Sequence, residues 1–203
     1  MVKTKIAVLV SGGGTNLQAL LDAQKAGKIP HGEIALVISN KEGAYALTRA
    51  EQAGVNTAVL TGKNFEARLQ ELLVSAGIEM IVLAGFMKIL SGEFTSKWPE
   101  RILNIHPALI PSFCGEGYYG LRVHEEALRR GVKVTGATVH FVNAIPDGGR
   151  IIAQKAVAVQ VDDTPETLQR RIMEQAEWII LPQAVSLFCQ DRLQVEGRIV
   201  HIL

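Results

Sequence analysis

The sequence predicts an α/β domain that is built on a mostly parallel β-sheet. Through the first half of the 203 residues, short apolar runs alternate with helical patterns. In the last third, longer runs rich in β-branched residues indicate further strands. Helices between successive strands supply the crossovers that parallel pairing needs, so the alternation favours a parallel sheet.

In the first half, the elements follow from the apolar runs and from the residues that end them. Strands are expected over residues 5–10, 34–38, 57–60, 80–84 and 102–105. Helices are expected over about 17–26, 44–53 and 65–76. The second and third helices end at Gly54 and Gly77, because glycine is a common residue just past a helix end.

The last third contains more strand and a long helix. Residues 134–142 and 151–159 are expected strands, and the sequence Pro-Asp-Gly-Gly forms a turn between them. Thr164 suits the N-cap of a helix and Pro165 its first position. This helix is expected to run to about Trp178, with Pro182 as a kink or a break before a second segment. Residues 193–200 resemble a small hairpin. Without a repeat or a linker, residues 1–203 are expected to form one domain.

Composition narrows the class of protein. Hydrophobic residues make up 48% and charged residues 20%, which is typical of a globular protein. The formal net charge of +1 argues against nucleic-acid binding. The two cysteines and five histidines show no metal-ligand spacing, so we expect neither a disulfide scaffold nor a metal site. The apolar run 6–10 is too short for a signal sequence or a membrane span, so a cytoplasmic protein without membrane contact is expected.

A glycine-rich segment, Ser-Gly-Gly-Gly-Thr-Asn over residues 11–16, lies between the first strand and the first helix. In an open α/β sheet, phosphates bind at this position. The segment lacks the Gly-Lys-Ser/Thr of a P-loop and the third glycine of a dinucleotide fingerprint. Ser39-Asn40 also stands where a ribose-binding acid would be expected. A phosphate monoester is therefore favoured, and the alternative is a tight turn that binds nothing.

Asn104 and His106 are candidate catalytic residues. They lie at i and i+2 near the end of a strand, so their side chains point to the same face, and Pro107 stops the strand. An amide donor beside an imidazole can stabilise an oxyanion and move a proton. Asp147 is the third candidate, and a carboxylate beside His106 would raise the pKa of the histidine. The plainer alternatives are a structural histidine, a cap asparagine and a turn aspartate.

Two further sites in the sequence have open interpretations. His140 alternates with apolar residues on an expected strand, and a half-buried strand residue is the favoured reading. Residues 84–90 are unusually apolar for a loop, and they form either a turn over the core or one wall of a pocket for a flat heteroaromatic ligand. Cys114 has no charged neighbours that would activate a nucleophile, so we expect no such role.

Five ordered motifs, at 11–19, 83–91, 103–111, 136–142 and 147–149, together resemble the phosphoribosylglycinamide formyltransferase family. The resemblance covers nearly the whole chain. It implies a doubly wound, mostly parallel seven-stranded sheet. It also implies transfer of a formyl group from 10-formyltetrahydrofolate to glycinamide ribonucleotide without a metal. Small-molecule substrates are the expected partners, and the chain is expected to be a monomer or a weak homodimer.

The resemblance also assigns roles to residues. It implies that His106 donates a proton, that Asn104 holds the formyl oxygen and contacts the folate, and that Asp147 raises the pKa of His106 and orders a water. His140 matches a histidine of the water network. Glu177 matches a glutamate that contacts the substrate ribose. The remaining matches are the phosphate loop, Gly14, Thr15 and Asn16, and the folate segment, Met87, Lys88, Ile89 and Leu90.

The sequence departs from the family pattern at three places. Lys88 stands where arginine is common, and Trp178 stands where histidine is usual. Residues 112–123 form a longer loop, richer in glycine and aromatic residues, which is expected to border the folate cleft. Lys63 is the candidate for the basic residue that meets the substrate or the folate tail.

The rival interpretations differ in their acceptor or in their class. Formyltetrahydrofolate hydrolase and methionyl-tRNA formyltransferase share the three catalytic residues, but each carries a further domain that is not expected here. The glycine-rich loop favours a phosphorylated small substrate over both. A non-catalytic phosphate-sensing α/β module is a rival from another class. An NAD-binding oxidoreductase is disfavoured because the loop lacks the fingerprint and the acid is missing.

Overall fold

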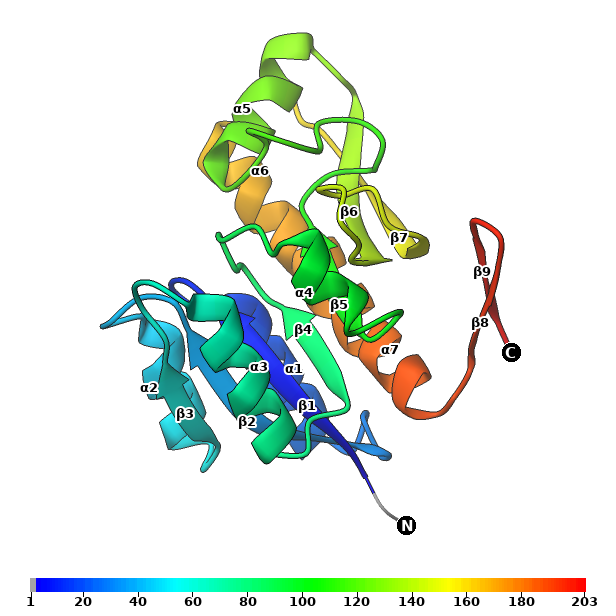
Figure 1. Ribbon diagram of the computed structural model, residues 1–203. Helices are drawn as coiled ribbons and strands as arrows, with labels where there is room; N and C mark the ends of the chain where they lie inside the picture. The colour runs from blue at the N-terminus through cyan, green and yellow to red at the C-terminus, as the bar shows by residue number, and fades with distance from the viewer. Residues whose placement is uncertain (1–2) are drawn as a thin grey trace.

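A seven-stranded sheet forms the middle layer of the computed structural model, which describes residues 3–203 (Figure 1). The strand order is β3-β2-β1-β4-β5-β6-β7. Strands β1 to β5 run parallel to one another, whereas β6 and β7 pair antiparallel. The predicted doubly wound, mostly parallel seven-stranded sheet is therefore confirmed.

All strands expected from the sequence are present, and their ends agree within two residues. The strands of the main sheet are β1 (Thr4–Val10), β2 (Gly32–Ser39), β3 (Asn56–Val59), β4 (Met80–Leu83), β5 (Ile102–His106), β6 (Val134–Phe141) and β7 (Ile151–Ala158). A separate hairpin, red in Figure 1, joins β8 (Leu193–Glu196) to β9 (Ile199–Ile202).

Helices cover both faces of the sheet. They are α1 (Thr15–Lys25), α2 (Tyr45–Gln52), α3 (Phe65–Ser75), α4 (Gly92–Ser96), α5 (Leu121–Arg130), α6 (Pro165–Ile172) and α7 (Trp178–Cys189), with a π-helical turn, η1 (Met173–Glu177), between the last two. Thr164 caps α6, since its hydroxyl accepts from the Thr167 N–H, and Pro165 is the first residue of the helix, as predicted.

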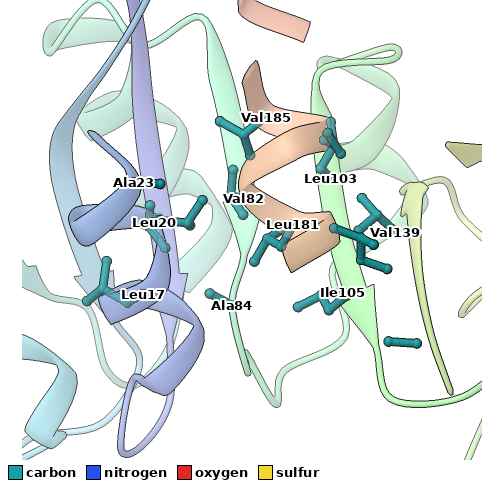
Figure 2. Close-up of a cluster of buried hydrophobic side chains, with 14 of the residues drawn as sticks. Leu17, Leu20, Ala23, Val82, Ala84, Leu103, Ile105, Val139, Leu181 and Val185 are labelled. Carbon is teal, nitrogen blue, oxygen red and sulfur yellow. The ribbon is translucent and has the colours of Figure 1, made fainter. Parts of the chain in front are cut away.

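Each central strand is buried on both faces because two hydrophobic clusters sandwich the sheet. In β1, Val8 belongs to the cluster that α1 and α7 cover, and Leu9 belongs to the cluster under α3. Figure 2 shows the first cluster, in which Leu181 and Val185 of α7 lie near Val82 of β4. Burial on both faces explains why these strands read as continuous apolar runs without alternation.

Pro182 does not break the last helix, so one of the two alternatives predicted there, the break, is wrong. Pro182 lies inside α7, and the irregularity precedes it as the π-helical turn η1. Proline has no N–H to give to the carbonyl four residues earlier, here that of Trp178. The wider turn η1 ends directly before Trp178. It accommodates the missing bond and lets the helix continue. Within residues 3–203, no helix combines the length and the apolar character that a membrane span needs.

Candidate active site

The strand order places a crevice between β1 and β4. The order reverses there, and ligands of open α/β sheets bind outside the carboxyl ends of the strands at such a point. The loops that follow β1 and β4 line a cavity of about 690 Å³. The Ser11 hydroxyl joins the two loops, since it accepts from the Met87 N–H at 2.8 Å and donates to Asn40 Oδ1 at 2.7 Å.

Asn104, His106 and Asp147 meet in this cavity, as the sequence predicted. Asn104 and His106 project from β5, and the turn between β6 and β7 brings in Asp147. His106 Nδ1 lies 3.4 Å from Asp147 Oδ2, and Asn104 Nδ2 lies 3.5 Å from Asp147 Oδ1. The antiparallel register also sets His140 opposite Asn104. Four polar side chains from three segments therefore converge on one point.

The contacts of His106 favour its charged form. Nε2 lies 2.8 Å from the carbonyl oxygen of Phe113, and Nδ1 faces the Asp147 carboxylate. Both neighbours only accept hydrogen bonds, so only the imidazolium donates to both. Burial nevertheless outweighs the Asp147 charge and the Phe113 carbonyl, and it lowers the pKa of His106. Asp147 acts on the pKa of His106 in the predicted sense, but burial has the larger effect, so the net shift is downward.

Asp147 is held in an uncommon backbone conformation. Its φ of 53° lies in the left-handed region, which aspartate tolerates better than most residues. Its Oδ2 accepts from the Gly115 N–H at 2.9 Å. Burial raises the pKa of Asp147, but bonding to His140, the His106 charge and the Gly115 N–H together hold this pKa below its usual value. Asp147 is therefore an anion between two histidines.

His140 serves as a support for Asn104. Its Nδ1 lies 2.8 Å from the carbonyl oxygen of Phe141, which fixes a proton on that nitrogen. Nε2 lies 3.2 Å from Asn104 Nδ2, so it accepts from that amide when it carries no proton and donates to Asp147 when it carries one. Nε2 also lies 3.4 Å from Asp147 Oδ1. The strand pattern favours a half-buried residue at this position, but His140 is fully buried and lines the cavity.

The glycine-rich loop and the π-helical turn η1 form a second wall of the cavity. Gly14 has φ 73°, and a Cβ atom there would lie 2.6 Å from Ala46 Cβ, so only glycine fits. Asn16 Nδ2 donates to Glu177 Oε2 at 2.6 Å, and Asn16 Oδ1 is buried without a partner in the described part of the chain. The phosphate-loop and ribose residues proposed from the resemblance are thus brought together, with Thr15 beside them.

Glu177 has an unusual charge state. Burial raises its pKa to about 7, although the hydrogen bond from Asn16 acts in the opposite direction. Below about pH 4.5, the ordinary pKa of glutamate, this carboxyl is protonated in both the folded and the unfolded chain, so it does not affect stability. As pH rises to about 7, the unfolded chain releases this proton first, so the folded state loses stability. The ligand-free protein therefore carries a buried acid that weakens it near neutral pH.

We expect Glu177→Gln to make the ligand-free protein more stable than the wild type at pH 8 but not at pH 4. The expected gain at pH 8 is on the order of 3 kcal/mol, the linkage value of the raised pKa. Urea denaturation at both pH values measures it. Glu125→Gln, at an exposed position of α5, is the matched control and is expected to show no pH-dependent difference. Equal effects of Glu177→Gln at both pH values would contradict the raised pKa.

The third wall of the cavity is apolar. It contains the predicted folate segment, Met87, Lys88, Ile89 and Leu90. Met87 and Ile89 are exposed, and Lys88 Nζ lies 4.5 Å from the ring centroid of Phe65. The long loop also reaches the cavity through Tyr118 and Tyr119, as expected, and Tyr118 packs against Phe113 with ring centroids 6.4 Å apart. Lys63 does not line the cavity.

His124 also lines the cavity, although nothing in the sequence indicates this. It lies on α5, is buried, and neither ring nitrogen has a hydrogen-bond partner within residues 3–203. Burial and, secondarily, the nearby His106 lower its pKa to about 4, so the ring is neutral at pH 7. Gln169 and Met173 also line the cavity from α6 and η1. No spacing pattern in the sequence marks any of these three residues.

The fold and the site define an α/β enzyme domain that holds small ligands at the carboxyl edge of a parallel sheet. The cavity joins a group suited to proton transfer with a glycine-rich loop suited to an anion. The chain belongs to the formyl transferase family, whose model matches residues 4–185.

Individual relatives agree with this membership. A phosphoribosylglycinamide formyltransferase of Haemophilus influenzae is 43% identical over 98% of this chain and 93% of that protein. The trifunctional purine biosynthetic protein adenosine-3 of Gallus gallus is 46% identical over 95% of this chain, which spans about a fifth (19%) of that longer protein. The crystal structure of glycinamide ribonucleotide transformylase 1 from Symbiobacterium toebii matches with a TM-score of 0.92 and 45% identity, covering 99% of this chain and 94% of that chain. The resemblance stated from the motifs is confirmed.

Proposed function

We propose that this chain transfers the formyl group of 10-formyltetrahydrofolate to the amine of glycinamide ribonucleotide, a step of purine biosynthesis. The observation that carries the proposal is the position of Asn104, His106 and Asp147 between two differently built walls of one cavity. An apolar wall fits a flat pterin, and a glycine-rich loop at a helix N-terminus fits a phosphate. The family and the relatives named above support the same reaction.

The reaction is a direct transfer. The substrate amine attacks the formyl carbon, a C–N bond forms, and the carbonyl oxygen becomes an oxyanion. The amine then loses a proton, N10 of the folate gains one, and the bond between N10 and the formyl carbon breaks. The products are formylglycinamide ribonucleotide and tetrahydrofolate. Holding both substrates in line converts a bimolecular reaction into an effectively unimolecular one.

Asn104 and His106 act on the oxyanion. The amide N–H of Asn104 and a protonated His106 both donate toward the developing negative charge, so their contribution is largest in the transition state. Asp147 opposes the effect of burial on the pKa of His106, and its contact with both histidines suits it to order a water that carries protons. His140 fixes the orientation of the Asn104 amide.

The substrates occupy opposite sides of these residues. Gly14, Thr15 and Asn16 bind the phosphate through the N-terminus of α1, and Glu177 contacts the ribose beside them. Met87, Lys88, Ile89 and Leu90 line the pterin site with Asn104 at its inner end. The cytoplasm is the proposed location.

The test is acceptor dependence. We expect tetrahydrofolate to form from 10-formyltetrahydrofolate only when glycinamide ribonucleotide is present, in equal amount with the formylated ribonucleotide. The measurement follows both products in the same reaction. If the formyl donor disappears at the same rate with and without the ribonucleotide, the protein is a hydrolase and the proposal is wrong. If neither product forms while both ligands bind, the protein is a binding module.

A further inference from the structure

We propose that Arg49 is a positioning residue, which holds the glycine-rich loop so that its N–H groups face the substrate phosphate. This inference rests on the function proposed above. Arg49 lies on α2, and it does not line the cavity that contains His106. It lines a neighbouring cavity of about 850 Å³ between α1 and α7, so it contacts the loop from outside the cavity that contains His106.

Two successive carbonyl groups of the loop are bound by α2. Arg49 Nε donates to the Gly13 carbonyl oxygen at 2.8 Å. The Ala46 N–H, in the first turn of α2, donates to the Gly12 carbonyl oxygen at 3.0 Å. The close contact of Gly14 with Ala46 sets the distance between the loop and this helix. One side of the loop is therefore attached to α2 at consecutive peptide groups.

This attachment determines where the loop N–H groups point. In a planar trans peptide, the carbonyl oxygen and the N–H of the next residue point in opposite directions. Because the Gly12 and Gly13 carbonyls point toward α2, the N–H groups of Gly13 and Gly14 point away from it. Within residues 3–203, neither N–H group donates to a protein acceptor. Successive free N–H groups of this kind form an anion-binding concavity.

Arg49 is itself fixed in place. Its Nη1 donates to Gln18 Oε1 at 3.0 Å, and its guanidinium carbon lies 5.0 Å from the ring centroid of Tyr45. The planar guanidinium thus contacts the Gly13 carbonyl, Gln18 and the Tyr45 ring at the same time. A lysine at this position keeps the positive charge, but its single nitrogen cannot reproduce this arrangement. Arg49→Lys therefore separates the charge of Arg49 from its hydrogen bond to the loop.

The experiment compares Arg49→Lys, Arg49→Met and the wild type in steady-state formyl transfer. The acceptors are glycinamide ribonucleotide and the corresponding ribonucleoside, which lacks the phosphate. For Arg49→Lys and Arg49→Met, we expect the KM for the ribonucleotide to rise about tenfold, as for the loss of one hydrogen bond at the site. We expect kcat, the KM for the folate and kcat/KM for the ribonucleoside to stay within about twofold.

Arg101→Lys is the matched control. Arg101 also donates to a backbone carbonyl, that of Glu79, at 3.1 Å. It directly precedes β5, so it lies at the amino end of that strand, whereas the glycine-rich loop follows the carboxyl end of β1. We expect this variant to behave as the wild type. A wild-type KM in Arg49→Lys with a raised KM in Arg49→Met would show that charge alone matters and would overturn the positioning role. Equal losses with both acceptors would also overturn it, since they indicate general distortion. A wild type that does not formylate the ribonucleotide refutes the proposed function, and the positioning role with it.

Discussion

His106→Ala is expected to lower kcat/KM for formyl transfer by about 10²–10⁴-fold, the range for losing a general acid–base group. The imidazole of His106 contacts both the Asp147 carboxylate and the Phe113 carbonyl. Without it, the oxyanion loses a charged donor and the Asp147 carboxylate loses one of its two histidine contacts. The measurement is the steady-state rate with saturating folate and varied ribonucleotide.

Two observations separate this loss of chemistry from a loss of folding. We expect His106→Ala to bind a folate analogue with wild-type affinity in a fluorescence titration, because the apolar wall is made by residues after β4. His201→Ala, on the exposed strand β9, is the control and is expected to keep full activity. A rate within tenfold of the wild type would reject the catalytic role of His106.

The sequence predicted the architecture because the signals for its strands are local. Each central strand is a short apolar run between helices, and burial on both faces produces that run directly. The face shared by Asn104 and His106 follows from the alternation of side chains along a strand. The resemblance, which rests on five motifs in order, supplied Glu177, the role of Asp147 in ordering a water, and the number of strands.

Other features depend on contacts between distant segments, which no local pattern encodes. The Phe113 carbonyl that faces His106 belongs to the long loop before α5, and its position follows from how that loop folds back. The lowered pKa of His106 is a balance between burial and the Asp147 charge, so its sign depends on depth in the cavity. The π-helical turn before Pro182 and the approach of His124 to the site likewise depend on tertiary packing.

Asp147→Asn is expected to lower formyl transfer on the order of 10³-fold at pH 7, within the range for acid–base groups. Asparagine keeps the shape of the side chain, and its oxygen can still accept from the Gly115 N–H. The charge is removed, and one of the two acceptor oxygens becomes an NH2 donor. The carboxylate is the main influence that opposes the burial of His106, so its loss lets the pKa of that histidine fall further.

The pH dependence identifies how Asp147 acts. Activity that needs protonated His106 declines as pH rises through the pKa of this histidine, so a lower pKa moves the decline to lower pH. We therefore expect Asp147→Asn to recover part of its activity between pH 7 and pH 5, whereas the control Asp162→Asn, at an exposed site, keeps the wild-type profile. The measurement is kcat against pH at saturating substrates. A loss of equal size at every pH would mean that Asp147 serves only to order a water or the loop, because a charge that sets the protonation of His106 must shift the profile as well as lower it.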